Sequence, residues 1–408
     1  MDVVWLIIDS LAFQTTSFSA DGPDTTPRLT ALAEEHGTVF TRAYAPGPLS
    51  PSSHASMFTG NLPSEAGMHE AYPYLDRSIP TIAERMSETH HTSLFSTNVW
   101  LFRGLDRGFA TTNDLGITDQ DGRQNSTDTN TGADKQHRHV SQLNNLVREA
   151  RGRRDRDEFI LVNYMDVHPP LDASSEALAK FAPDHSLSEL PIGVSPERHI
   201  ENEEKSYNLD LMEKLYHSAI WDFDREFAPL VEELLMDDVF VVVTSDHGIW
   251  HQNTAYSDSR LHVPLVIFTP GTEESIVPHT VSLRSIPRTI DQYINGGSQF
   301  NGPSLLETEE DQLSITEVIH HPNAVYEKTG RVDVTKENHA TGEVQRDLVL
   351  IHGESRADYI NGEWTPDSAT GCIREIGEEI LTQDVNMGEQ KLSYDEGVME
   401  RLEDLGYK

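Results

Sequence analysis

The stretch that decides the fold is VFVVVTSDHG, residues 239–248, a valine-rich run that stops at Asp246, His247 and Gly248. A short apolar run rich in β-branched residues predicts a strand that is buried on both faces. Four further apolar runs follow the same pattern and are also predicted to be strands: VVWLII (3–8) before Asp9, TSLFST (92–97) before Asn98, FILVNYM (159–165) before Asp166 and His168, and HVPLVIFT (262–269) before Pro270 and Gly271.

Helical patterns alternate with these strands. TPRLTALAEEHG (26–37) has the proline start and glycine stop of a helix, and SIPTIAERMSE (78–88) begins in the same way. Residues 213–237 carry apolar side chains at helical spacing over several turns. Strands that alternate with helices predict an α/β fold, with a mostly parallel sheet sandwiched by helices.

The remaining segments predict loops and a smaller unit. Residues 111–157 are polar and are expected to begin as a surface loop and become a helix near 139–152, and residues 171–206 are expected to run irregularly over the surface. Beyond about residue 310, short strand-like pieces precede a closing helix at 396–408. We therefore predict a catalytic domain over 1–310 and a C-terminal α+β subdomain with a short antiparallel sheet over 311–408.

The charge balance excludes some partners. Among 408 residues, 68 are acidic and 31 basic, which gives a formal net charge of −37. A field of that sign repels nucleic acid and anionic membranes. The acidic residues are spread along the chain, which favours a halophilic protein that works where salt screens self-repulsion. The alternative interpretation is an acidic cytosolic protein without this adaptation.

The sequence gives few signs of export or cross-linking. The single cysteine, Cys372, excludes an intrachain disulfide and a cysteine-rich zinc site. No run approaches the roughly 18 apolar residues that a membrane span needs. The apolar run at the N-terminus has no basic region before it and stops at an aspartate, so we expect the chain as given to stay in the cytoplasm.

Polar side chains follow several of the predicted strands. In an open parallel sheet, ligands bind beyond the carboxyl ends of the strands, which is where Asp9, His168, Asp246 and His247 are expected. Each has an ordinary alternative, since Asp9 could cap a helix, Asp246 could form a turn and His168 could be a solvated loop residue. Together they predict a site for one divalent cation, such as Ca²⁺, Mg²⁺, Mn²⁺ or Zn²⁺.

A serine-rich helix start lies between the first two predicted strands. PLSPSSHASMFTG (48–60) either is an ordinary capped helix start or holds a serine that does chemistry. The free N–H groups and the dipole of such a start attract anions. A serine there is placed to attack a phosphate or sulfate ester, and a metal ion could activate it.

These motifs resemble those of the sulfatase family within the alkaline phosphatase superfamily. The acidic composition resembles that of the family's haloarchaeal members. The resemblance covers nearly the whole chain and keeps the family's order and spacing. It implies an alkaline-phosphatase-like fold. The segments that carry it are the first strand to Asp9, TTPRLTALAEEHGTVFTRAYAPGP (25–48), the serine-rich segment, PSEAGMH (63–69), NYMDVHPP (163–170), VTSDHG (243–248), HVPLVIFTPG (262–271) and LEDLGYK (402–408).

The resemblance implies a role for each matching residue. The family's nucleophile falls on Ser50, and His168 falls on a histidine that contacts the substrate anion or the leaving group. His262 lies near the family's last cationic position, and a histidine that merely begins a strand is the alternative. The implied set comprises Ser50, His168 and His54 as catalytic residues, Asp9, Ser10, Ser50, Asp246 and His247 around the metal, and Asn98 and His262 at the substrate.

The chain departs from the family at several positions. The family pattern has proline where this chain has Ser52 and arginine where it has His54, and the enzymes that convert the nucleophile to formylglycine read those two residues. We therefore expect no formylglycine. Ser10 stands at the second acidic ligand position, and Asn98 lies in the region of an absent Lys-x-His pair, where its amide could donate a hydrogen bond.

Two functions follow from this reading. The first is a metal-dependent hydrolase or transferase, with Ca²⁺ favoured, that acts on a sulfate or phosphate ester of a small molecule, glycan or lipid head group. An unmodified serine favours the phosphorus ester. The second is a catalytically degenerate family member that binds an anionic glycan or a partner, which the loss of cationic positions favours and the retained strand-end residues oppose.

Overall fold

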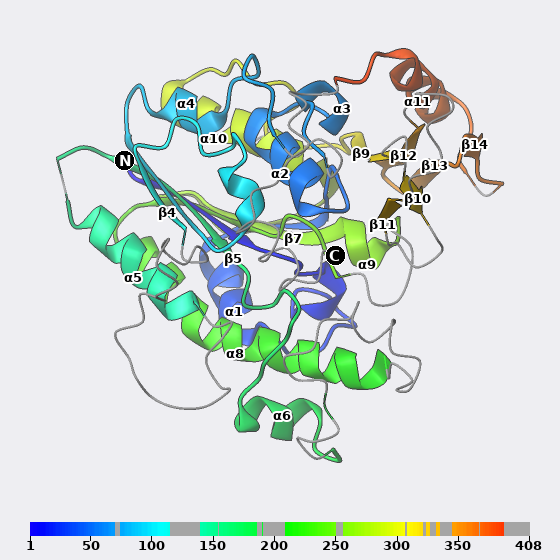
Figure 1. The fold of residues 1–408 in the computed structure, drawn as a ribbon. Coiled ribbons are helices and arrows are strands. Elements are labelled where there is room, and N and C mark those ends of the chain that lie inside the picture. Colours follow the sequence, from blue (N-terminus) through cyan, green and yellow to red (C-terminus); the bar gives the residue numbers. More distant parts are fainter. Residues whose placement is uncertain are drawn as a thin grey trace.

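The chain is described here by a computed structural model, shown in Figure 1. The residues that the structure describes are 1–69, 74–114, 139–153, 155–185, 190, 209–249, 256–306, 308–320, 324–326, 332–334, 345–366 and 368–386.

An eight-stranded sheet forms the centre of the described chain, with strand order β4-β3-β5-β1-β6-β7-β2-β8. All neighbouring strands are parallel except that β7 runs antiparallel to both β6 and β2. The predicted mostly parallel α/β sheet is therefore confirmed. Its strands are β1 (Val3–Ile8), β2 (Thr38–Tyr44), β3 (His91–Ser96), β4 (Thr111–Asp114), β5 (Glu158–Tyr164), β6 (Phe240–Thr244), β7 (His262–Phe268) and β8 (Ser275–Ser282).

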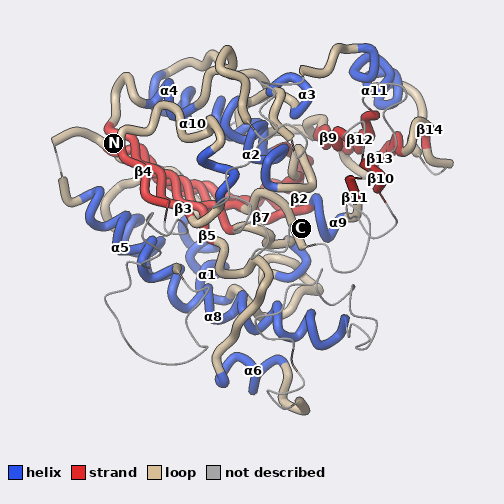
Figure 2. Tube along the Cα trace, in the orientation of Figure 1, coloured by secondary structure: helices blue, strands red, loops and turns tan. Residues whose placement is uncertain are grey.

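Helices cover both faces of this sheet, as Figures 1 and 2 show. Alternate residues of a strand point to opposite faces, so Leu6 packs with apolar side chains of α1, α5 and α8, whereas Trp5 packs with those of α2, α4 and α10. The helices are α1 (Pro27–His36), α2 (Ser50–Thr59), α3 (Pro63–Ala66), α4 (Ile82–Met86), α5 (Val140–Arg151), α6 (Ser175–Phe181), α8 (Leu209–Leu235), α9 (Asp258–Leu261), α10 (Ile286–Asn295) and α11 (Cys372–Thr382).

The helices mostly follow the sequence predictions. The helix expected over 78–88 begins later, at Ile82, because the Thr81 side chain accepts a hydrogen bond from the N–H of Glu84 and caps the helix there. The irregular course expected over 171–206 is wrong at α6, where Ser174 caps a seven-residue helix by accepting from Ala177 N–H. Of that segment, the structure describes residues 171–185 and 190, and the other residues lie outside the described part of the chain.

A second, antiparallel sheet follows residue 310, as the sequence predicted. Its order is β14-β13-β12-β9, from β9 (Ser314–His320), β12 (Gln345–His352), β13 (Ser355–Ile360) and β14 (Glu363–Trp364). A separate pair joins β10 (Ala324–Tyr326) to β11 (Val332–Val334). The closing helix expected at 396–408 lies outside the described residues, and the domain boundary at 310 stays a prediction.

The second sheet packs beside the segment that leads into α2. The N–H of Glu317 donates to Pro46 O at 3.0 Å, and the Thr316 hydroxyl donates to Ala45 O at 2.6 Å. This contact fixes the main chain a few residues before Ser50.

Among the described helices, none combines the length and hydropathy that crossing a membrane requires.

Candidate active site

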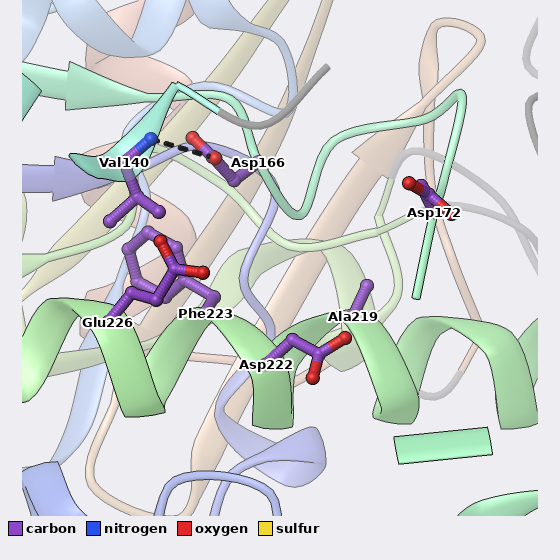
Figure 3. Close-up of a pocket in the computed structure, with 7 residues that line it drawn as sticks. All are labelled: Val140, Asp166, Asp172, Ala219, Asp222, Phe223 and Glu226. Carbon is purple, nitrogen blue, oxygen red and sulfur yellow. Dashed lines mark hydrogen bonds between the residues drawn. The ribbon is translucent and has the colours of Figure 1, made fainter. Parts of the chain in front are cut away.

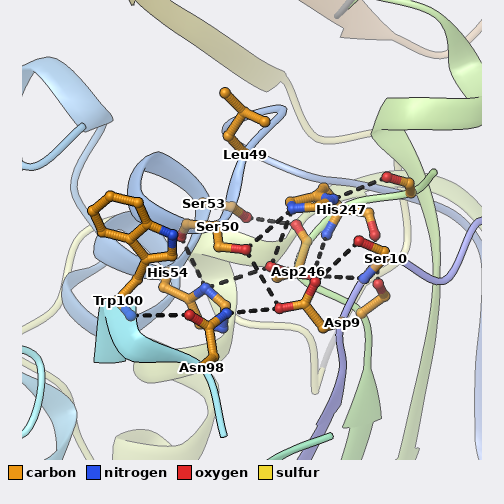
Figure 4. Close-up of polar contacts among 12 residues, drawn as sticks. Asp9, Ser10, Leu49, Ser50, Ser53, His54, Asn98, Trp100, Asp246 and His247 are labelled. Atoms are coloured by element: carbon orange, nitrogen blue, oxygen red, sulfur yellow. Dashed lines mark hydrogen bonds and ion pairs between the residues drawn. The ribbon is translucent and has the colours of Figure 1, made fainter. Parts of the chain in front are cut away.

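Two carboxylates meet at one edge of the central sheet. β1 pairs with β6 so that Ile7 lies opposite Thr244, and Asp9 and Asp246 each come two residues beyond this pair. Since the carboxyl ends of parallel strands share an edge, the two side chains lie together. Figure 4 shows them beside His247 and Ser50, with α2 on the other side of the group.

The three strand-end residues form a compact cluster. One ligand atom from each of Asp9, Asp246 and His247 lies within 4.8 Å of the others, and all three residues are buried. Ser10 links the carboxylates, because its N–H donates to Asp246 Oδ1 at 3.1 Å and its hydroxyl donates to Asp9 Oδ1 at 3.0 Å. The Ser10 backbone is left-handed, with φ of 63°. In this uncommon conformation Ser10 contacts both carboxylates.

The donor atoms of this cluster fit a divalent cation. His247 Nδ1 lies 2.9 Å from the carbonyl of Gly248, so Nδ1 carries the proton and Nε2 keeps its lone pair. Nε2 lies 3.4 Å from Asp246 Oδ2, a buried oxygen to which no hydrogen bond of good geometry is directed within the described chain. Two acceptor atoms that face each other in a buried site leave a deficit that a cation fills, and carboxylate with imidazole suits the ions predicted from the sequence.

Burial dominates the electrostatics of the cluster. It raises the pKa of Asp246 well above the usual range, and the nearby charge of Asp9 raises it further. Burial also acts to raise the pKa of Asp9, but electrostatic interactions with neighbouring histidines, His168 foremost, and the hydrogen bond from Ser10 outweigh it and hold that pKa below its usual value. Burial, together with the charge of Arg260, lowers the pKa of His247 well below the usual range. His247 is therefore neutral, as a metal ligand must be.

Ser50 is the first residue of α2 and faces the cluster. Its hydroxyl lies 3.2 Å from His247 Nε2 and 3.4 Å from Asp9 Oδ2. Pro51 follows, at a position where a missing N–H costs nothing, and the Ser53 hydroxyl donates to the carbonyl of Asp246 at 2.6 Å. Of the serines in residues 48–60, Ser50 is thus the one whose hydroxyl lies among the ligand atoms.

His54 and Asn98 also contact the cluster. His54 Nδ1 lies 2.8 Å from Ser50 O and 3.5 Å from Asp246 Oδ2, and burial lowers the pKa of this histidine. The amide of Asn98 donates to Asp9 Oδ2 at 2.7 Å and its oxygen accepts from Trp100 N–H at 3.0 Å. In this structure both side chains therefore contact the site's own groups, and the catalytic role of His54 and the substrate-binding role of Asn98 stay predictions.

The two remaining predicted residues lie in different settings. His168 is half-buried just after β5, the strand that pairs with β1, and its electrostatic interaction with Asp9 lowers the pKa of that carboxyl. The ring of His262 stacks between Phe13 and Tyr44, with centroid distances of 4.3 and 5.1 Å, and its Nε2 lies 2.8 Å from Thr41 O. The proposed contact of His262 with substrate is untested.

Sequence reasoning missed a buried cation at the site. Arg260 is 3% exposed, and its guanidinium donates to Gly248 O at 2.9 Å while Gly248 N–H donates to Arg260 O at 2.7 Å. A Cβ at Gly248 would lie 2.0 Å from Ser259 O, so only glycine allows this approach. The quoted Asp-His-Gly motif holds the glycine, but no local signal pairs it with an arginine twelve residues later.

An acidic pocket whose lining does not include the cluster residues lies against α8. Figure 3 shows Asp166, Asp172, Asp222 and Glu226 around it. Two of these carboxylates bind helix starts, since Asp166 accepts from Val140 N–H and Asp222 accepts from the Ser174 hydroxyl. We therefore assign Asp166 and Asp222 to helix capping.

The fold and the cluster define a class of protein, an α/β protein with a buried group of side chains at the carboxyl edge of its sheet that could hold a metal ion. A family model described as "Sulfatase" matches residues 1–306. The chain therefore belongs to the sulfatase family, of the alkaline phosphatase superfamily. No curated protein matches the chain in a sequence search.

Solved structures share this fold at low sequence identity. A phosphonate monoester hydrolase from Silicibacter pomeroyi matches with a TM-score of 0.68 at 17% identity, over 97% of this chain and 98% of its own. Ps i-CgsB, solved with k-i-k-neocarrahexaose, matches with a TM-score of 0.64 at 17% identity, over 100% and 99%. A protein solved with its substrate D-glucosamine-2-N,6-O-disulfate matches with a TM-score of 0.64 at 14% identity, over 89% and 90%.

Proposed function

We propose that the chain is a metal-dependent hydrolase or transferase of a phosphate or sulfate ester, with unmodified Ser50 as the nucleophile. The observation that carries this proposal is the position of the Ser50 hydroxyl, 3.2 Å from His247 Nε2 at the start of α2. A helix start of this kind attracts an anionic ester to the serine.

The chain's own residues account for the bond changes. Ser50 Oγ gives its proton to water and bonds to phosphorus or sulfur, and the bond from that atom to the leaving oxygen breaks. His168 donates a proton to the leaving oxygen. Water then attacks the seryl ester, its oxygen stays on the released phosphate or sulfate, and a proton restores the Ser50 hydroxyl. An acceptor alcohol in place of water gives transfer.

The metal site completes this chemistry. Asp9, Asp246, His247 and the Ser50 oxygen would hold the cation, with Ser10 beside them. A bound divalent ion lowers the pKa of a coordinated hydroxyl and neutralises the charge of an ester. We propose Ca²⁺, with Mg²⁺, Mn²⁺ and Zn²⁺ to be compared, because two carboxylates and a hydroxyl are hard oxygen ligands.

Two considerations favour a phosphorus ester. A seryl sulfate lacks the elimination route of formylglycine, and Ser52 and His54 replace the residues that formylglycine formation needs. One similar structure is a phosphonate monoester hydrolase. Another was solved with a sulfated sugar as its substrate, so esters of both elements belong in the test. A small molecule, glycan or lipid head group remains the proposed carrier.

The test is a hydrolysis panel at high salt with aryl sulfate, aryl phosphate, aryl phosphodiester and aryl phosphonate monoester, with and without a chelator. Ser50→Ala is compared with Ser56→Ala, a matched control on the same helix. Ser56 is also fully buried, and its hydroxyl has no hydrogen-bond partner in the described structure. We expect Ser50→Ala to lower kcat on the order of 10³-fold or more and Ser56→Ala to leave it nearly unchanged.

The other outcomes separate the alternatives. Turnover that survives Ser50→Ala would reject this nucleophile. Absence of turnover on all four esters, with metal bound, would favour the degenerate binder of an anionic glycan or partner. The halophilic and cytoplasmic assignments stay predictions. Salt-dependent unfolding, described below, tests the first of these, and cell fractionation tests the second.

A further inference from the structure

Asn163 lies in the sheet directly behind the nucleophile helix. It is fully buried on β5, where it pairs with Ser96 on β3 and with Ile7 on β1. Its Nδ2 lies 3.4 Å from Nε2 of His54, and its Oδ1 accepts from the Ser96 hydroxyl at 3.3 Å. Asn163 therefore joins two strands of the sheet to the ring that contacts Ser50.

The donor and the acceptor of each of these hydrogen bonds can be assigned in one consistent way. The carbonyl of Ser50 can only accept, so Nδ1 of His54 carries the proton. His54 Nε2 then has a lone pair, which suits the amide N–H that Asn163 presents.

A second series of hydrogen bonds also connects Asn163 to Ser50. The Ser96 hydroxyl oxygen accepts from Asn98 N–H at 2.8 Å, and the Asn98 amide donates to Asp9 Oδ2. The Ser50 hydroxyl donates to that same oxygen. The closed ring runs through Ser50, His54, Asn163, Ser96, Asn98 and Asp9, and Figure 4 shows four of these members: Asp9, Ser50, His54 and Asn98.

We propose that Asn163 and Ser96 are positioning residues that hold His54 in its Nδ1–H tautomer and thereby fix the main chain and hydroxyl of Ser50. With the proton on Nε2 instead, Nδ1 would turn a lone pair toward the Ser50 carbonyl and toward Asp246 Oδ2, 3.5 Å away. Two such acceptor contacts in a buried site are unfavourable, so α2 would move. The catalytic part of this inference rests on the proposed function.

The first test reads the tautomer and needs no turnover. The full-length protein carries ¹⁵N-labelled histidine, and long-range ¹⁵N–¹H correlation spectra identify which ring nitrogen of His54 is protonated. The His54→Gln variant assigns the signal. We expect Nδ1–H in the wild type. In Asn163→Asp the carboxylate can only accept, so we expect the proton to appear on Nε2.

The second test reads kinetics on the ester that the wild type turns over fastest. Ser96→Ala removes one link of the ring, and we expect kcat to fall about tenfold or more, with KM changed less than about twofold. Ser96→Thr keeps the hydroxyl and is expected to restore most of the activity. Ser93→Ala is the matched control, because Ser93 is buried on the same strand but contacts Arg153 and Glu158 outside the ring.

Each outcome decides the proposal. A wild-type His54 that carries its proton on Nε2 overturns it, and so does a folded Asn163→Asp variant whose tautomer is unchanged. If Asn163→Asp does not fold, the wild-type tautomer and the Ser96 series still decide. Absence of turnover on every ester would count against the proposed function alone, since the tautomer is measured independently.

Discussion

Two groups of buried charges in this chain are built in opposite ways. At the contact between the second sheet and α3, Glu317 is fully buried and accepts from Ser64 N–H at 2.8 Å, from the Ser64 hydroxyl at 3.0 Å and from the Arg346 guanidinium. Arg346 donates in turn to the carbonyls of Ile380 and Gln383, both at 3.0 Å. This negative charge is fully compensated by the protein.

The cluster at the edge of the central sheet is not compensated in this way. Within the described chain, Asp9 and Asp246 contact neutral groups and imidazoles, and no guanidinium or ammonium group forms an ion pair with either. Buried charge without a partner is costly, and a protein retains it where a ligand supplies the counter-charge. The difference is consistent with a structural role for Glu317 and with the proposed metal-binding role of the two aspartates.

The largest effect on stability is expected from Glu317→Gln. The substitution leaves Arg346 buried without its counter-charge, which should lower the free energy of unfolding by about 3–5 kcal/mol. Denaturant titration measures it. The control is Glu354→Gln, which removes the partner of Arg42 at a side chain that is 94% exposed, where the loss should be below about 1 kcal/mol. Equal losses in both variants would remove the distinction between the two regions.

The aspartate cluster should respond to cations instead. Addition of Ca²⁺ to chelated protein, at about 100 times its dissociation constant, should raise the free energy of unfolding by about 2.7 kcal/mol. Asp246→Asn should abolish most of this gain, whereas Glu354→Gln should keep it. Calorimetric melting with each candidate ion gives the comparison. A gain that persists in Asp246→Asn would place the cation elsewhere.

A partly buried histidine outside both groups tests the cost of burying a charge. Burial on α8 lowers the pKa of His217 from 6.5 to about 4, so the unfolded chain binds its proton more readily. The stability that neutral His217 preserves is present above pH 6.5 and is lost as the pH falls toward 4. Between pH 8 and pH 5 the loss should be about 2 kcal/mol.

The matching measurement is unfolding of the wild type and of His217→Gln at pH 8 and pH 5. The variant should lose less stability in acid than the wild type. His36→Gln, at an exposed position, should follow the wild type. If His217→Gln keeps the full acid sensitivity, another group is responsible.

The smallest effect on stability, counted per charged group, is expected from salt, because salt screens all the surface charges together. A net charge of −37 repels itself, and screening shortens that repulsion to about 3 Å at 1 M salt. The melting temperature should therefore rise from low to molar KCl. Substitution of KCl by a neutral osmolyte separates screening from solute exclusion. A melting temperature that does not change would contradict the halophilic prediction.

Much of the site could be predicted because its signals are local. The apolar runs ended at Asp9, Asp246 and His247, and strand ends on one sheet edge must converge. Ser50 followed from a helix start beside them. Asn163 gave no such signal, because an asparagine within a strand shows its role only when the pairing of β5 with β3 places Ser96 beside it. Arg260 likewise depends on the fold of the turn around Gly248.

The sequence by itself determined the class of fold, the edge at which the site lies and the residue types gathered there, since periodicity and strand ends are properties of neighbouring residues. Only the tertiary structure decided which atoms face one another. It turned His54 toward the Ser50 carbonyl, stacked His262 against Phe13 and Tyr44, and left Asp246 Oδ2 without a hydrogen bond of good geometry from the described residues. Such contacts join residues up to hundreds of positions apart, and their geometry depends on packing that no single segment encodes.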